Sequence, residues 1–178
     1  DHLALLRGPS FAERVHVLPA YEFDYYRGLL PNPETFFERN VGLYHALNDP
    51  AGRTFFTSVG ALLQRVLPVD AFLGAVVTAK RDGEIDRDAF AAALVASGYT
   101  RQPSVQDPGT FAVRGGVVDV FSPLYEFPYR IELFGDLVEQ VRFFDPKTQR
   151  SLDAMAEAHA VPVGACTLPA PEALPEAR

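Results

Sequence analysis

Lysine is scarce in this sequence of 178 residues. It occurs only at Lys80 and Lys147, and the formal net charge is -7. No sequence-wide positive field therefore attracts phosphates, and nucleic acid binding would need a local basic patch, of which no run is visible. The remaining positive charge is arginine, whose planar guanidinium suits bidentate pairing with carboxylates. This composition favours a protein partner.

Cysteine and long apolar runs are scarce as well. The single Cys166 cannot form an intrachain disulfide, which predicts a reducing, cytoplasmic location. Apolar runs such as residues 72–79 are far shorter than the roughly 20 residues needed to cross a bilayer. The N-terminus also lacks a signal-peptide pattern. We therefore expect a cytoplasmic chain with no membrane partner.

The patterns of common catalytic sites are missing. No Gly-Lys pair is present for a phosphate-binding loop, and no Gly-x-Ser-x-Gly motif for a nucleophile. The four histidines are far apart in the sequence, which argues against a zinc site. The double glycine Gly115-Gly116 lies inside a strand pattern, and a bulge is a better interpretation of it than phosphate binding. We expect no enzyme activity, metal or cofactor in this chain.

The first 70 residues alternate strands and helices. Asn32-Pro33-Glu34 predicts a helix start, because it combines a capping side chain, a proline at the first helical position and an acid near the positive dipole end. This helix should run to about residue 48. Strands are expected at 14–18 and 53–57 and a second helix at 58–67. The pattern predicts a parallel α/β layer over 1–70, incomplete with two strands. The expected apolar face of the first helix is Phe37, Val41, Tyr44 and Leu47.

Four aromatic residues follow the first expected strand: Tyr21, Phe23, Tyr25 and Tyr26. They could stack on nucleic acid bases. The acidic residues Glu22 and Asp24 between them favour packing against neighbouring elements instead.

From residue 71 the pattern changes to α+β. A strand at 72–80, a turn at Arg81-Asp82-Gly83 and a helix capped by Asp86 and closed by Gly98 are expected. Strands at 111–121, 129–134 and 137–144 then follow with only short turns between them. This order predicts an antiparallel meander over 71–163 with one helix to cover a face. Residues 164–178 have the composition of a linker. The expected apolar stripe of the helix is Phe90, Ala93 and Leu94.

The strand at 129–134 is informative about function. Alternation places Tyr129, Ile131 and Leu133 on an apolar face, and Arg130, Glu132 and Phe134 on a mixed face. A phenylalanine beside an arginine is either the margin of a core or the composition of an interface hot spot. Arg114, just before the double glycine, could reach the same face through a bulge.

Residues 109–121 (GTFAVRGGVVDVF), 128–136 (PYRIELFGD) and 143–151 (FFDPKTQRS) together resemble the second domain of UvrB and of the transcription-repair coupling factors (Mfd proteins). Residues 18–22 and 59–68 resemble the coupling factors more than UvrB. The similarity covers about residues 14–163. It implies that 1–70 are part of a degenerate RecA-like domain 1 and that 71–163 are a UvrB-like domain 2. We expect the chain to be part of such a protein.

The resemblance also implies a partner. In this family domain 2 binds UvrA, and the contacting pattern falls on Arg114, Arg130 and Phe134, with Glu132 between them as a further candidate. The family's regions for RNA polymerase binding and ATP-dependent DNA translocation have no counterpart in the sequence. We therefore expect a non-catalytic module that docks UvrA. The alternatives are a DNA-contacting element, the equivalent module of UvrB, and a hydrolase.

Overall fold

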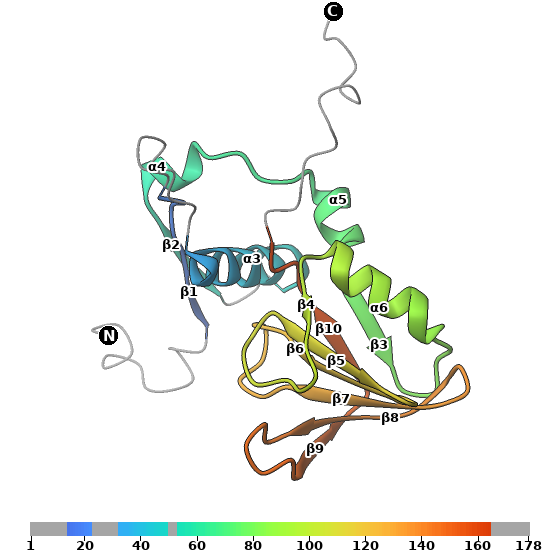
Figure 1. The fold of residues 1–178 in the computed structure, drawn as a ribbon. Helices are drawn as coiled ribbons and strands as arrows, with labels where there is room; N and C mark the ends of the chain where they lie inside the picture. Colours follow the sequence, from blue (N-terminus) through green and yellow to red (C-terminus); the bar gives the residue numbers. More distant parts are fainter. Residues whose placement is uncertain (1–13, 23–31, 50–52, 165–178) are drawn as a thin grey trace, which may run out of the picture. The chain divides into compact units, whose positions relative to one another are not determined.

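The computed structural model describes residues 14–22, 32–49 and 53–164 (Figure 1). The chain divides into two compact units, Asp1–Val66 and Leu67–Arg178. Cys166, Phe23, Tyr25 and Tyr26 lie outside the described residues, as does most of the expected linker.

The first unit is an α/β layer, as predicted. Strands β1 (Val15–Leu18) and β2 (Thr54–Thr57) pair in parallel, and helix α3 (Pro33–Asn48) lies between them in the sequence. Asn32 caps α3, because its side-chain oxygen accepts a hydrogen bond from the Glu34 backbone N–H at 3.1 Å. The helix start, both strands and the parallel pairing are therefore confirmed.

The packed face of α3 differs from the expected one. Leu47 is 39 % exposed, and the other three expected residues are half-buried. The buried residues are Arg39, Asn40 and Gly42. A Cβ atom at Gly42 would overlap Leu18 Cδ2, so the small residue sets where the helix approaches β1. Hydrophobicity alone could not reveal this close approach.

Two expectations between residues 58 and 80 are confirmed only in part. The helix expected at 58–67 is only α4 (Val59–Leu62), capped by Ser58. The strand expected at 72–80 divides into helix α5 (Val69–Gly74) and strand β3 (Val77–Lys80). A short apolar run does not distinguish a buried helix from a strand. Here Asp70 in the first turn of α5 favours the helix.

The second unit contains a six-stranded sheet in the order β4-β5-β6-β7-β8-β9. All neighbours pair antiparallel except β4 with β5, so the predicted meander is confirmed. Strand β10 (Glu157–Ala160) pairs with β3 in a separate antiparallel sheet. Strands β4, β9 and β10 were not predicted from the sequence. The sheet strands are β4 (Thr100–Arg101), β5 (Thr110–Arg114), β6 (Val117–Phe121), β7 (Tyr129–Phe134), β8 (Leu137–Phe144) and β9 (Ser151–Met155).

The double glycine forms a turn and not the expected bulge. Gly115 and Gly116 connect β5 to β6 in a hairpin in which Arg114 pairs with Val117. Gly115 has a φ of 59°, which glycine adopts without strain. A Cβ atom at Gly116 would lie 2.7 Å from the Leu133 carbonyl oxygen. The turn can therefore pack closely against β7.

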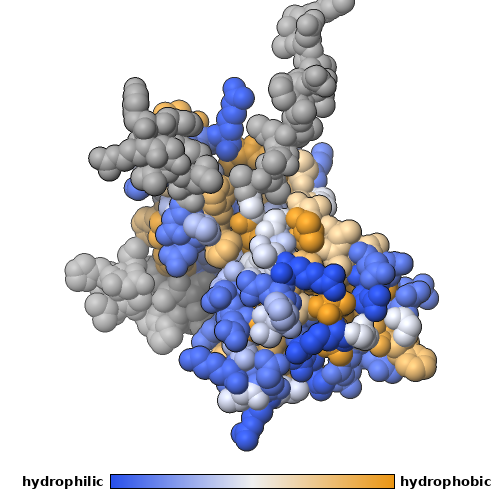
Figure 2. Space-filling model, viewed as in Figure 1, coloured by the Kyte–Doolittle hydropathy of each residue, from blue (hydrophilic) through white to orange (hydrophobic). Residues whose placement is uncertain are grey.

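Helix α6 (Arg87–Ala96) begins at Asp86, whose side chain accepts a hydrogen bond from the Ala89 N–H at 2.7 Å. Phe90 and Leu94 are buried, as predicted, and Ala93 is half-buried. Figure 1 shows α6 alongside β3. Figure 2 shows mainly hydrophilic residues on the visible face of the strand region below this helix, with smaller hydrophobic patches between them.

Candidate protein-docking site

The mixed face of the sheet carries all four residues expected in the docking site. Arg114 on β5 pairs with Val117 on β6, which pairs with Glu132 on β7. Arg130 and Phe134 alternate with Glu132 along β7 and share its face. Opposite them, Tyr129 and Ile131 are 0 % and 1 % exposed. The predicted alternation of β7 is therefore confirmed.

Asp119 joins two of these residues. It lies on β6 opposite both Ala112 and Arg130. Arg130 Nε donates to its Oδ1 at 2.6 Å, and Arg130 Nη2 donates to its Oδ2 at 2.9 Å. Arg114 Nη2 donates to the same Oδ2 at 2.6 Å. One carboxylate thus binds two guanidinium groups from strands on either side of it.

Sequence reasoning missed Asp119, which is only 1 % exposed. A buried carboxylate needs partners, because an unpaired charge in the interior is strongly destabilising. A signal was present in the sequence Val-Val-Asp-Val-Phe, where a lone acid interrupts an apolar strand. Its alternation with Val118 and Val120 places it on the other face of β6, beside Ala112 and Phe121, which belong to a buried apolar cluster.

Arg130 interacts mainly with other residues of the protein. Besides Asp119, its Nη2 donates to the Gln149 side-chain oxygen at 2.9 Å, and its guanidinium lies 4.5 Å from the centre of the Phe144 ring. Its side chain is 16 % exposed. The hydrogen bonds to Asp119 raise the pKa of Arg130 above its ordinary value. The Arg114 side chain, by contrast, is 51 % exposed.

Glu132 forms an ion pair with Arg142 on β8. Both side chains are partly exposed, at 29 % and 27 %. Solvent weakens an ion pair in such a position, so its contribution to stability is small. The pair lies on the same face as Arg130, since Arg130 and Arg142 are cross-strand partners.

Phe134 and Leu137 form an apolar edge at the end of the β7–β8 hairpin. They are cross-strand partners, and their side chains are 74 % and 43 % exposed. Cross-strand neighbours on one face lie close enough to interact directly. The pairing with Leu137 was not predicted from the sequence, although a two-residue turn at Gly135-Asp136 makes Phe134 and Leu137 cross-strand partners.

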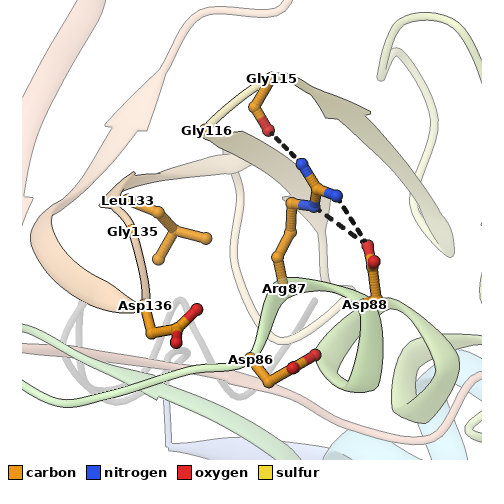
Figure 3. A pocket seen from close by; sticks show the side chains of 8 residues that line it. All are labelled: Asp86, Arg87, Asp88, Gly115, Gly116, Leu133, Gly135 and Asp136. Atoms are coloured by element: carbon orange, nitrogen blue, oxygen red, sulfur yellow. Dashed lines mark hydrogen bonds and ion pairs between the residues drawn. The ribbon is translucent and has the colours of Figure 1, made fainter.

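A pocket lies on the other side of the same hairpin, with a volume of about 350 Å³ (Figure 3). Within it, Arg87 binds the Asp88 carboxylate and donates to the Gly115 carbonyl oxygen at 3.1 Å. The Arg87 contact ties α6 to the β5–β6 turn beside Arg114. The pocket is lined by Asp86, Arg87, Asp88, Gly115, Gly116, Leu133, Gly135 and Asp136.

Among residues 14–22, 32–49 and 53–164, no group of three or more His, Cys, Asp or Glu side chains could hold a metal ion. The described helices include none long and apolar enough to cross a membrane. Tyr21 packs on Phe36, with ring centres 4.6 Å apart, and beneath the Arg39 guanidinium, as expected of a packing residue.

Comparison with known proteins identifies the second unit. Residues 77–164 match the family model described as the UvrB interaction domain. This part of the chain belongs to the UvrB interaction domain family. The matched residues include β3, α6 and all strands of the six-stranded sheet, and therefore the whole mixed face.

The full chain is similar to transcription-repair-coupling factors. It is 40 % identical to that of Myxococcus xanthus over 156 residues, which are 88 % of this chain and 13 % of the relative. It is 34 % identical to that of Mycobacterium bovis over 93 % of this chain and 14 % of the relative. The Haemophilus influenzae factor is 29 % identical over 85 % of this chain and 13 % of the relative. The chain thus spans about one seventh of the length of these relatives.

The mixed face of this UvrB interaction domain has an exposed part and an internal part. Phe134, Leu137 and half of Arg114 face solvent. Asp119 and most of Arg130 do not. What the face offers a partner is therefore an apolar edge together with an arginine whose position is set from within the sheet.

Proposed function

We propose that this UvrB interaction domain docks UvrA, as a non-catalytic module of transcription-coupled nucleotide excision repair. In a complete coupling factor, RNA polymerase and DNA would be bound by other parts of the protein. The similarity to the coupling factors supports a role in this repair process. The exposed Phe134 supports docking, because a large aromatic side chain left 74 % exposed at a strand end contributes little to packing in the unit.

The surroundings of Phe134 have the composition of a protein interface. Aromatic and arginine side chains are enriched among residues that dominate binding energies. Here Phe134 and Leu137 supply apolar surface, and Arg114 supplies a half-exposed cation on the same sheet face. The partner surface that fits them has an apolar depression and a carboxylate near its rim.

The experiment is a titration of UvrA against the full chain and its Phe134→Ala variant. Loss of a central hot-spot residue typically weakens affinity by about thirtyfold or more. Phe127→Ala is a matched control, since Phe127 is also exposed, at 37 %, but precedes the opposite end of β7. Equal binding by the native chain and Phe134→Ala would contradict the proposed surface, and no binding by the native chain would contradict the proposed partner.

The alternative of DNA contact rests on the arginines of the same face. Salt separates the two functions, because phosphate binding releases counterions and weakens steeply as salt rises. We expect binding to UvrA to retain much of its affinity between about 50 mM and about 200 mM salt, whereas DNA binding through several phosphates would fall by orders of magnitude. A blank titration with ATP is expected as well, since no phosphate-binding loop occurs in the sequence.

A further inference from the structure

We propose that Asp119 is a positioning residue of the docking face. It holds the Arg114 guanidinium in place for the partner, and Arg130 acts through the same carboxylate and not on the partner directly. This inference rests on the proposed docking of UvrA. It changes the roles within the site, because Arg130 becomes an internal support and Arg114 the arginine that makes contact.

The hydrogen bonds of Asp119 hold its carboxylate in place. Both carboxylate oxygens are used, Oδ1 by Arg130 and Oδ2 by Arg130 and Arg114 together. The two hydrogen bonds from Arg130 fix the orientation of the carboxylate, since the guanidinium and carboxylate groups are both planar. The oxygen that binds Arg114 is therefore held in a defined position on the sheet.

The exposures of the three side chains indicate which of them a partner can reach. Asp119 is 1 % exposed and Arg130 is 16 % exposed, so a partner has little access to either. Arg114 is 51 % exposed, although one of its terminal nitrogens is bound to Asp119. Arg114 thus presents an accessible cation whose side chain is already restrained. A restrained side chain loses less conformational entropy on binding.

Stability alone is a weaker explanation of this cluster. A buried ion pair often contributes no more than apolar residues of similar size would, because removing charges from water is unfavourable. The remaining contacts of Arg130 also serve position, since it stacks on Phe144 and binds Gln149 in the β8–β9 turn. They anchor the guanidinium that orients Asp119.

The test is a pair of double-mutant cycles, measured by titration of UvrA with the full chain. Arg114→Ala is combined with Asp119→Asn in one cycle and with Arg130→Lys in the other. If Asp119 and Arg130 act through Arg114, each of these changes weakens binding by about fivefold or more in the native background and has little further effect in the Arg114→Ala background. Additive losses in either cycle would overturn the proposal.

A matched control variant and the Arg130→Lys cycle keep the result interpretable. Asp153→Asn removes an exposed acid on β9 and should leave binding unchanged. Arg130→Lys retains the cation next to the buried carboxylate, so its cycle remains usable if Asp119→Asn does not fold. Coupling in that cycle supports the proposal, and additivity there overturns it.

NMR of the arginine side chains separates the positioning role from the docking function. In the native chain, the Arg114 guanidinium signals should be ordered and protected from exchange, and Asp119→Asn or Arg130→Lys should reduce both properties. Unchanged Arg114 signals would overturn the positioning role even if UvrA binds. Reduced order together with no UvrA binding by the native chain would refute the docking function alone.

Discussion

Replacement of Phe134 by alanine should separate binding from stability. The side chain is 74 % exposed, so about a quarter of its surface is covered in the folded unit. A fully buried phenylalanine costs about 3 to 5 kcal/mol on truncation, and this fraction of it is about 1 kcal/mol. For a domain of this size, such a loss lowers the melting temperature by roughly 4 to 8 °C. UvrA affinity should fall by about thirtyfold or more.

Ile131→Ala is the internal standard for this prediction. Ile131 lies on the same strand, faces the core and is 1 % exposed, so its truncation should cost about 2 to 5 kcal/mol. Thermal melts and UvrA titrations of both variants give the comparison. If Phe134→Ala lowers the melting temperature as much as Ile131→Ala does, Phe134 is a structural residue. If it melts normally and binds UvrA at native affinity, the docking surface lies elsewhere.

Two further predictions concern the turn and the first unit. Gly116→Ala should destabilise the second unit by about 1 to 3 kcal/mol, because the new methyl group meets the Leu133 carbonyl oxygen, whereas Gly74→Ala meets no atom within 4 Å and should melt normally. Burial, followed by the positive charge of Arg53, lowers the pKa of His45 from 6.5 to about 4. The unfolded chain therefore takes up this proton first, and stability of the first unit should be constant above about pH 6.5 and decrease between there and about pH 4. Urea unfolding followed through the amide signals of α3 should show this decrease, and His45→Gln should reduce it; a pH-independent midpoint would contradict the reasoning.

The helix caps and the alternation of side chains along β7 could be predicted, because both depend only on residues close together in the sequence. Asn32 and Asp86 cap the starts of helices, because their side chains accept hydrogen bonds from backbone N–H groups of the first turn. Tyr129 and Ile131 alternate with Arg130 and Glu132, and period two alone separates the two faces. Arg130, Glu132 and Phe134 share a face for the same reason, whereas Arg114 reaches that face through the pairing of β5 with β6 and not through the predicted bulge.

Elements that depend on distant contacts were misplaced. The apolar run that begins at Phe72 is compatible with a helix or a strand until its neighbours are known. The hairpin at Gly115-Gly116 differs from these elements, since a Gly-Gly pair between two strand patterns is a local signal of a two-residue turn, and the prediction of a bulge was wrong. The packed face of α3 follows Gly42 and not the larger apolar residues.

The sequence by itself determined the class of fold, the resemblance to the coupling factors and four residues of the mixed face, though not Asp119, because local spacing and family motifs carry this information. Only the tertiary structure decided which of those residues are available to a partner. Arg114 and Arg130 are 16 positions apart in the sequence, yet both bind Asp119, since β6 lies between their strands. Exposure and ion pairing depend on strand order and register, and these arise only when the whole sheet assembles.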